Sequence, residues 1–452
     1  MNQIRNTPKN TIAATSLALI AASALASCLT GGSAIGQGSS FPVIVSLSTA
    51  GVQANGESEE SYPNRTGSMI AFRSTASNLS PIDNTAVYQK IFIRNRTAGR
   101  TDLVSVGFGN VPADGSSYKP SVDNTGDVIA FASDATNLVP GDSNGVGDIF
   151  VRDMTRGTTT RVSVPDGGGE ADGPSDTPSI SGNGARIAFR SNATNLVPTP
   201  SSTYSDIYVR DSVAGTTRRV SVASDNSPSN GYSPFSAISR DGRFVVFVSY
   251  GSNLVPGNGD GNNAADIFVR DLDGGTTERV SVTGVNGELP QGASAYGVSP
   301  PFSVSADGRF VAFMSEDNTV VPNDNNGTTD VFVRDRIAHT TEIVSVSSSG
   351  EIGDGISEFP SISDDGRFVV FRSYATNFSP GIPNPVGDIF VHDRTSGTTR
   401  RVGLGPAGVV ADRCPGKARV SGDGSIVTFP SAATNLAPGD VNNVTDIFIV
   451  PF

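Results

Sequence analysis

Residues 360–371 read Pro-Ser-Ile-Ser-Asp-Asp-Gly-Arg-Phe-Val-Val-Phe, and residues 388–393 read Asp-Ile-Phe-Val-His-Asp. Both stretches contain the β-branched and aromatic residues that favour strands. The Asp365-Gly366 pair is a strong hairpin signal, because Gly adopts a positive φ without steric cost. The first stretch therefore predicts two strands joined by a tight turn, and the second predicts a further strand.

This pattern recurs seven times, which indicates a repeat architecture. The Phe that closes the second strand occurs at positions 72, 131, 189, 247, 313, 371 and 429, at spacings of 59, 58, 58, 66, 58 and 58 residues. A Gly-containing turn and another strand, such as residues 216–222, follow the Asp-Ile-Phe-Val stretch. We name the four strands of a unit A, B, C and D in chain order. Seven such units predict an all-β, seven-bladed β-propeller of four antiparallel strands per blade, with strand A innermost.

The ends of the repeat predict how the ring closes. The last unit stops after its strand C, at residues 446–452, whereas residues 43–48 match the strand D pattern and precede the first strand A. We expect this N-terminal strand to complete the last blade, because closure removes an exposed sheet edge. A solenoid of stacked units is the alternative, and it would need caps that the sequence does not contain.

The Ser-x-Asp-Gly-Arg-Phe-Val-Ala-Phe pattern, followed by Asp-Ile-Phe-Val-Arg-Asp, resembles the TolB-type, WD-repeat-like propeller family across residues 42–452. The resemblance implies the propeller fold. It implies little about function, because the family contains scaffolds, enzyme-associated domains and lipoproteins.

The N-terminus has the composition of a targeting segment. Arg5 and Lys9 precede an apolar and small-residue run at residues 12–26, which is too short to span a bilayer comfortably. The run ends in Leu-Ala-Ser before Cys28, which resembles a bacterial lipobox and implies cleavage before Cys28 and lipidation of its thiol. Ordinary cleavage with Cys28 incidental is the alternative.

The resulting organisation is a lipoprotein signal peptide at 1–27, a flexible tether at 28–41 and the propeller at 42–452. It places the protein outside the cytoplasm as a membrane-anchored lipoprotein of the periplasm, outer membrane or cell surface. The lipid is its expected contact with the membrane.

Charge and composition restrict the function. The net charge is −12, so a nucleic-acid partner is not expected. Of the two histidines, His339 and His392, each is a single departure from a repeated structural position, so neither a catalytic triad nor a three-ligand zinc site is indicated. A carboxylate pair for glycoside cleavage remains open, but no pair stands out. The Arg-Asp pair that ends strand C recurs in most blades, which favours a structural role.

The loops between strands B and C alternate Asp and Asn around a Gly, like a fragment of a calcium loop. The loop at residues 324–330 shares this pattern. Side-chain-capped turns are the alternative explanation, and calcium is the one cofactor considered. The candidate metal ligands are Asp142, Asn144 and Asp148 in one unit, and Asp440, Asn442 and Asp446 in another.

The single 66-residue spacing is the largest break in the repeat. It contains two extra residues near 257–263 and six more within 283–301, and both segments should lie on the face of the B–C and D–A loops. Drift of an unconstrained loop is the alternative. The candidate ligand-binding residues at and beside the insertions are Tyr232, Phe235, Glu288, Gln291, Tyr296, Glu358 and Phe359.

The sequence therefore favours a monomeric, non-catalytic binding or scaffold protein. Its partner would be a protein or a cell-envelope polymer held on the B–C/D–A face. The alternative is an extracytoplasmic polysaccharide lyase or hydrolase that uses loop carboxylates.

Overall fold

The computed structural model describes residues 41–452 except 83–86, 200–203, 256–263, 284–286 and 290–299. Residues 40–452 form one compact unit. The predicted signal peptide, Cys28 and all of the tether except residue 41 lie outside the described residues. In the described part of the chain, every regular element except two 3₁₀ turns, Phe108–Asn110 and Pro406–Gly408, is a β-strand.

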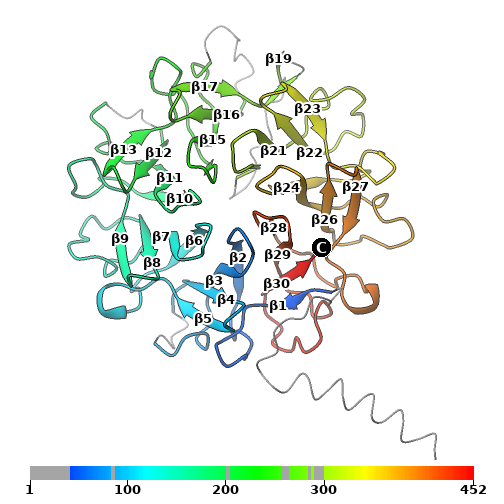
Figure 1. Ribbon diagram of the computed structural model, residues 1–452, viewed down its shortest axis with the longest axis horizontal. Helices are drawn as coiled ribbons and strands as arrows, with labels where there is room; N and C mark the ends of the chain where they lie inside the picture. Colours follow the sequence, from blue (N-terminus) through cyan, green and yellow to red (C-terminus); the bar gives the residue numbers. More distant parts are fainter. Residues whose placement is uncertain (1–40, 83–86, 200–203, 256–263, 284–286, 290–299) are drawn as a thin grey trace, which may run out of the picture. The chain divides into compact units, whose positions relative to one another are not determined.

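Seven four-stranded antiparallel sheets surround a central axis, so the predicted all-β, seven-bladed propeller is confirmed (Figure 1). Blade 1 contains β2 (Ser58–Pro63), β3 (Met69–Ser74), β4 (Lys90–Asn95) and β5 (Arg100–Leu103). Blade 2 contains β6 (Ser117–Val122), β7 (Val128–Ser133), β8 (Asp148–Asp153) and β9 (Thr158–Arg161). Blade 3 contains β10 (Ser175–Ile180), β11 (Arg186–Ser191), β12 (Asp206–Asp211) and β13 (Thr216–Arg219).

The next three blades follow the same order. Blade 4 contains β14 (Ser236–Ile238), β15 (Phe244–Ser249), β16 (Asp266–Asp271) and β17 (Thr276–Arg279). Blade 5 contains β20 (Phe302–Val304), β21 (Phe310–Ser315), β22 (Asp330–Asp335) and β23 (Thr340–Ile343). Blade 6 contains β24 (Ser357–Ile362), β25 (Phe368–Ser373), β26 (Asp388–Asp393) and β27 (Thr398–Arg401). A small hairpin of β18 (Val282–Thr283) and β19 (Gly287–Glu288) lies between blades 4 and 5 in the sequence.

Blade 7 joins the two ends of the described chain. It has the order β1-β30-β29-β28, from β1 (Val43–Ile44), β30 (Asp446–Pro451), β29 (Ile426–Ser431) and β28 (Arg419–Val420). Val43 pairs with Ile449, and the N–H of Val45 extends the ladder by donating to the Ile447 carbonyl at 2.8 Å. The predicted closure by the N-terminal strand is therefore confirmed.

The Phe residues that mark the repeat form the centre of each blade. In every blade the aromatic ring of strand B stacks on an aromatic ring of strand C, with centroids 5.6–6.3 Å apart. These rings lie opposite each other in the register, as Phe313 and Phe332 do in blade 5. Burial of two rings per blade supplies much of the apolar area that stabilises a sheet of this size.

The Asp-Gly turns serve both the hairpin and the contact between blades. Gly366 has φ +75°, and its N–H donates to the carbonyl of Ser363 at 2.9 Å. A Cβ at this position would lie 2.2 Å from the ring of Phe310 in the preceding blade. The glycine is thus required twice, once for the backbone conformation and once for the close approach of the neighbouring aromatic ring.

Neighbouring blades are joined by the serine of the Pro-Ser-Ile motif. The hydroxyl of Ser361 accepts a hydrogen bond from the N–H of Val420 in the next blade at 3.1 Å. Three other serines accept an N–H from the following blade in the same way: Ser121 from Ile180, Ser179 from Ile238 and Ser303 from Ile362. The recurring serine therefore builds the blade interface.

The A–B turns form a closed ring of hydrogen bonds. The N–H of Asn124 donates to Gly182, that of Gly182 to Arg240, and that of Asp241 to Ala306. Three further bonds of the same kind continue the ring. The N–H of Ala306 donates to the carbonyl of Asp364, that of Asp364 to the carbonyl of Gly422, and that of Asp423 to the carbonyl of Arg65. The side-chain amide of Asn64 completes it by donating to the carbonyl of Asn124 at 3.2 Å. All seven blades are therefore tied together at one face.

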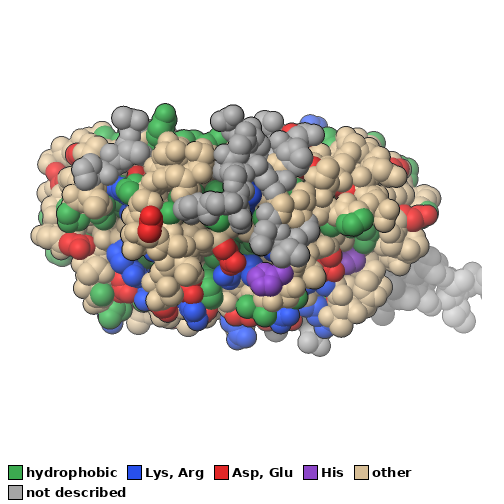
Figure 2. Space-filling model, turned by 90° about the horizontal axis from the view of Figure 1, so that it is seen from above, with side chains coloured by type: hydrophobic (Ala, Val, Ile, Leu, Met, Phe, Trp, Pro, Cys, Tyr) green, Lys and Arg blue, Asp and Glu red, His purple; other side chains and the backbone are tan. Residues whose placement is uncertain are grey.

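The surface outside this ring is mixed in charge. Figure 2 shows the propeller edge-on, with acidic and basic side chains intermixed along its lower edge rather than gathered by sign.

Candidate functional site

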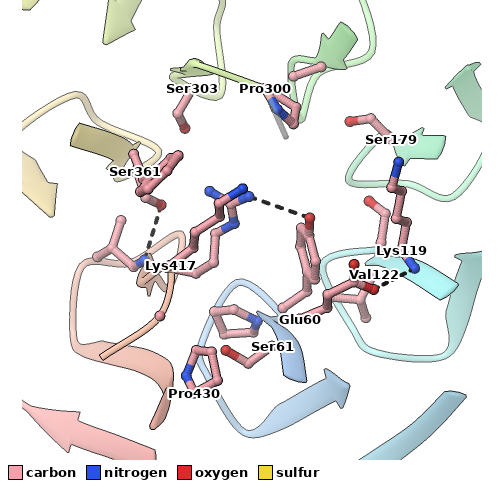
Figure 3. A pocket seen from close by; sticks show the side chains of 18 of the residues that line it. Glu60, Ser61, Lys119, Val122, Ser179, Pro300, Ser303, Ser361, Lys417 and Pro430 are labelled. Atoms are coloured by element: carbon pink, nitrogen blue, oxygen red, sulfur yellow. Dashed lines mark hydrogen bonds between the residues drawn. The ribbon is translucent and has the colours of Figure 1, made fainter. Parts of the chain in front are cut away.

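A cavity of about 700 Å³ lies on the axis of the propeller. Its wall is formed by the innermost strands β2, β6, β10, β14, β20, β24 and β28, so every blade contributes to it (Figure 3). The D–A connections, through Pro300 and Cys414, line one end. The A–B turns, through Arg240 and Asp364, line the other. This volume lies in the range of cavities that enclose small ligands.

Four of the inner strands have a β-bulge at the cavity wall. The residue at the bulge has a positive φ although it is not glycine: Glu60 (54°), Lys119 (53°), Thr177 (52°) and Phe359 (57°). The strand registers shift at the same places. All four residues line the cavity. Backbone strain of this kind is concentrated at functional sites, where the surrounding structure holds it.

Three cations of the wall have no carboxylate partner in the described part of the chain: Lys119, Lys417 and Arg419. Arg419 donates to the hydroxyl of Tyr62 at 3.4 Å, and its guanidinium lies 5.0 Å from the centre of that ring. The ammonium of Lys417 lies 4.4 Å from the centre of the Phe359 ring. The cavity thus combines uncompensated positive charge with aromatic surface.

Other arginines near the cavity are held by acids. At equivalent positions of blades 1, 3 and 6, the arginine of strand B pairs with an acid of strand A: Arg73 with Glu59, Arg190 with Asp176 and Arg372 with Glu358. The carboxylate of Glu60 accepts the backbone N–H of Lys119 at 2.8 Å. The acids of the wall are therefore occupied, and no free carboxylate pair lies among its described residues.

The far end of the cavity is crossed by a three-residue ion pair network. Arg240 from blade 4 reaches Asp364 of blade 6 at 2.8 Å, and Arg65 of blade 1 reaches the other oxygen of the same carboxylate at 3.1 Å. These contacts narrow the axis at the A–B face.

Burial lowers the pKa of both lysines of the cavity. The pKa of Lys417 falls to about 8, because desolvation and the nearby charges of Arg419 and Arg372 disfavour the ammonium. Desolvation also lowers the pKa of Lys119. Lys417 therefore changes its charge just above neutral pH.

The predicted ligand-binding residues are separated by the structure. Phe359 lines the cavity, and Glu358 holds Arg372 beside it. Tyr232 is exposed, stacks on Tyr250 and accepts a hydrogen bond from Arg190 at 2.7 Å. Phe235 is 6% exposed and packs in the core between blades 4 and 5, so its ring is not available to a ligand.

The remaining candidates fall in the long insertion. Gln291 and Tyr296 lie outside the described residues, as does the whole of the 257–263 segment. The backbone of Glu288 is in β19, opposite Val282. Of the described residues on either side of this insertion, Pro300 lines the cavity, whereas Glu288 does not.

The candidate calcium ligands of blade 2 surround a cation that the chain itself provides. Nη1 of Arg161 lies 3.0 Å from Asp142 Oδ1 and 3.3 Å from Asp148 Oδ2, and 2.9 Å from Glu170 Oε1. The amide of Asn144 donates to Asp148 at 2.9 Å. The guanidinium takes the position between the carboxylates where a calcium ion would have to bind.

Blade 7 repeats the loop without the arginine. The amide of Asn442 donates to Asp446 Oδ2 at 2.7 Å, and Ser46 donates to the other oxygen. Ile44 stands opposite Phe448, where blade 2 has Arg161 opposite Phe150. Calcium binding by Asp440, Asn442 and Asp446 stays a prediction.

The histidines and the Arg-Asp pairs have structural contacts. The Nδ1 atom of buried His392 lies 2.8 Å from the hydroxyl of Thr399, a contact that Arg334 makes with Thr341 in blade 5. Asp335 accepts the N–H groups of the following turn and binds Arg309 of its own blade. These residues stabilise the C–D turns.

The cations of the cavity are not among the residues predicted from the sequence, because the predicted candidates lie in loops and at the insertions. The signal was present at the start of blade 7, where Ala418-Arg419 replaces the Pro-Ser of the motif and Lys417 takes the position that Phe359 has in blade 6. Two cations at and just before the innermost strand of one blade are a departure from the repeat as clear as the long insertion.

Among the described residues, no helix is both long and apolar enough to cross a bilayer. No protein-family model and no curated protein sequence matches the chain.

Solved structures similar to this chain include two lyases. An oligogalacturonate lyase in complex with manganese matches at 12% identity and TM-score 0.52, over 89% of this chain and 92% of that one. The oligogalacturonate lyase from Vibrio parahaemolyticus matches at 11% identity and TM-score 0.51, over 88% and 91%. TolB from Acinetobacter baumannii matches at 16% identity and TM-score 0.39, over 88% and 74%. At these identities the likeness shows a common fold, the β-propeller.

Proposed function

We propose that this chain is an extracytoplasmic binding protein of TolB-like architecture that holds a carboxylate-bearing polymer of the cell envelope in its central cavity. It acts without catalysis, as a monomer. The lipid on Cys28 anchors it to a membrane, and residues 28–41 serve as a flexible tether.

The observation that carries this proposal is the charge of the cavity. Lys119, Lys417 and Arg419 line it without carboxylate partners, in a chain whose net charge is −12. A positive cavity in an acidic protein attracts anions locally while the outer surface repels them, so the cavity is the place where a polyanion binds. Tyr62 and Phe359 add apolar faces suited to sugar rings or aliphatic groups.

The similar lyase structures support a carboxylate ligand. Their names give oligogalacturonate, an acidic oligosaccharide, as what they act on. The ligand proposed for this chain shares the chemistry of oligogalacturonate, a chain of sugars that each bear a carboxylate. Oligogalacturonate is therefore a suitable probe.

The test is calorimetric titration of the purified chain with a short oligogalacturonate. Binding is expected to be saturable, and Lys417→Met and Arg419→Met should each weaken it about tenfold, because each removes a charge-assisted contact. Arg156→Gln, which changes an arginine of a C–D turn with an 81% exposed side chain, is the matched control and should leave binding unchanged. A neutral oligosaccharide of equal length should not bind. Equal affinity for both sugars, or no effect of the cavity variants, would refute the proposal.

One observation favours a lyase as the second candidate. With a pKa of about 8, Lys417 can accept a proton near neutral pH. It would take the C5 proton of a uronate, a C4–C5 double bond would form, and the C4–O bond would break with its electron pair going to the departing sugar oxygen, which would take a proton from water. Arg419 would neutralise the adjacent carboxylate. The ultraviolet absorbance of the unsaturated product, present with the wild type and lost in Lys417→Met, would establish this activity in place of simple binding.

The manganese of the similar lyase has no matching ligand set here. Within the described ranges, no group of three or more His, Cys, Asp or Glu side chains is arranged to hold a metal ion. We therefore derive no step through manganese.

A further inference from the structure

The outer half of each blade contains a repeated contact between an acid and a base. In four blades the Asp that begins strand C pairs with an Arg at the end of strand D. The N–O distances are 3.3 Å for Asp148–Arg161, 3.3 Å for Asp206–Arg219, 3.2 Å for Asp266–Arg279 and 2.7 Å for Asp388–Arg401. The acids are fully buried, so the guanidinium balances a charge that water does not reach.

Blade 1 changes both partners together. Its strand C begins with Lys90, which is buried, and its strand D has Leu103 where the arginine would stand. Blade 1 thus lacks both the buried acid of strand C and the arginine of strand D, and Lys90 takes the place of the acid. Blade 5 differs from blade 1, because it keeps the buried Asp at the start of strand C but has no Arg in strand D. Blade 7 shares this difference.

In blade 5, Ile343 replaces the arginine. The register aligns Ile343 with Phe332 as it aligns Arg161 with Phe150 in blade 2. The buried acid is Asp330, whose Oδ1 accepts a hydrogen bond from Ser345 at 2.6 Å. No guanidinium reaches this acid from strand D.

The surrounding loop is otherwise the same in the two blades. Asp324 precedes Asp330 by six residues, as Asp142 precedes Asp148. The amide of Asn326 donates to Asp330 Oδ2 at 2.6 Å and to the carbonyl of Gly353 at 2.9 Å. The amide of the equivalent Asn in blade 2 makes the same two contacts, at 2.9 and 3.2 Å. The loop that in blade 2 holds two carboxylates around one nitrogen is therefore preserved in blade 5.

Two oxygens of this loop are buried and have no hydrogen-bond partner. They are Oδ1 of Asp324, a residue only 7% exposed, and Oγ1 of Thr328. A buried carboxylate oxygen without a donor costs more than a kilocalorie per mole in most proteins, so such atoms indicate a missing partner. Both atoms lie in the loop that ends at Asp330.

A third acid lies nearby, at a position where the other six blades have Ala or Gly. Asp317 is 2% exposed; burial raises the pKa of Asp324, and the nearby charge of Asp317 raises it further. Blade 5 has therefore lost a buried cation and gained a buried acid in the same region.

We propose that blade 5 binds a calcium ion in the position that the arginine guanidinium occupies in its sister blades, with Asp324, Thr328 and Asp330 as oxygen ligands. Calcium accepts carboxylate, hydroxyl and carbonyl oxygens from one short loop in flexible geometry. Because no three acidic or nitrogen ligands converge within the described residues, backbone carbonyls and water complete the coordination. The calcium ion balances the buried acid as the strand D arginine does in the sister blades. The stability of blade 5 therefore depends on calcium. This site is independent of the central cavity.

The experiment compares the thermal midpoint of the purified full chain after chelation and after addition of calcium chloride. Calcium at a hundred times its dissociation constant should raise the midpoint by about 3–6 °C, and calorimetry should give saturable binding. Because blade 7 also keeps its buried acid without an arginine, all variants are made in an Asp440→Asn background, in which Asp324→Asn, an isosteric change, should abolish the response. Ile343→Arg should abolish it too, and should raise the midpoint of the chelated protein, because the arginine restores the contact of the sister blades.

Asp142→Asn is the matched control, since it changes the equivalent acid of the blade that has its own arginine. It should leave the calcium response intact. Magnesium chloride at the same concentration should give a weaker response, because magnesium demands a stricter octahedral geometry. The proposal fails if wild-type protein shows no calcium response, or if Asp324→Asn responds like the wild type.

Discussion

The rings of Phe313 and Phe332 stack with their centroids 5.6 Å apart across the two central strands of blade 5. Both side chains are completely buried. Phe313→Ala should therefore destabilise the protein by about 3–5 kcal/mol through the cavity it leaves. Denaturant unfolding measures this change. Phe108→Ala, at a ring that is 89% exposed, is the control and should change the stability by less than about 0.5 kcal/mol.

Closure of the ring depends on the hydrogen bond from Val45 to Ile447. Val45→Pro removes the donor and should cost about 3 kcal/mol or more, because a ladder bond is lost at a buried position. Val45→Ala keeps the donor and isolates the packing contribution. An equal loss in the two variants, measured by thermal unfolding, would show that the ladder bond adds nothing to closure.

The serine hydroxyl of the Pro-Ser-Ile motif should stabilise the contact between blades, so removing it and adding it should change the stability in opposite directions. Ser361→Ala should destabilise by about 1 kcal/mol, since the N–H of Val420 loses its acceptor. Blade 4 has Ala237 at this position, and Ala237→Ser should provide an acceptor for the equivalent N–H of Val304 and stabilise by about 0.5–1 kcal/mol. Equilibrium denaturation of both variants against the wild type tests the two signs.

Stability should fall in acid through the ion pairs of the C–D turns. Arg309 lowers the pKa of Asp335 to about 2, and Arg243 lowers that of Asp271 to about 2. Because the folded pKa lies below the unfolded value of 3.8, these groups stabilise the protein fully above about pH 4 and lose this contribution as the pH falls toward 2. Thermal midpoints between pH 5 and pH 2 should drop less steeply in Asp335→Asn than in the wild type.

Binding of an anion in the cavity should depend on the charge of Lys417. Its pKa is about 8, so raising the pH from 7 to 9 removes a positive charge and should weaken binding of the oligogalacturonate probe. Lys417→Arg keeps the charge and should bind with little change over this range, whereas Lys417→Met should bind weakly throughout. A pH dependence that persists in Lys417→Arg would assign the titration to another group.

The repeat made the architecture predictable. Residues that recur, such as the stacked Phe of strands B and C or the Asp-Gly turn, are the ones that build a blade, and their number and spacing were enough to predict seven blades and the closing strand. The same recurrence removed Asp335 and its counterparts from the list of functional residues, and their turn contacts agree with that interpretation.

The site was less predictable, because it depends on which way particular side chains point. Lys119 and Phe359 reach the cavity through β-bulges that no simple alternation predicts. The acids of blade 2 looked like metal ligands because Arg161, which follows Asp142 by 19 residues, meets them only once strands C and D are in register. Phe235 lies in the loop before strand A of blade 4, which made it a candidate ligand-binding residue, yet its ring packs into the core.

The pairing of Val43 with Ile449 also has a kinetic consequence. Blades 1 to 6 each form from consecutive residues, so they can fold as soon as their own segment is available. Blade 7 requires two segments separated by almost the whole chain, and contacts between such distant segments form slowly. The last step of folding is therefore the capture of β1 by β30. Until that step occurs, β30 presents an unpaired edge to chaperones and to other copies of the chain.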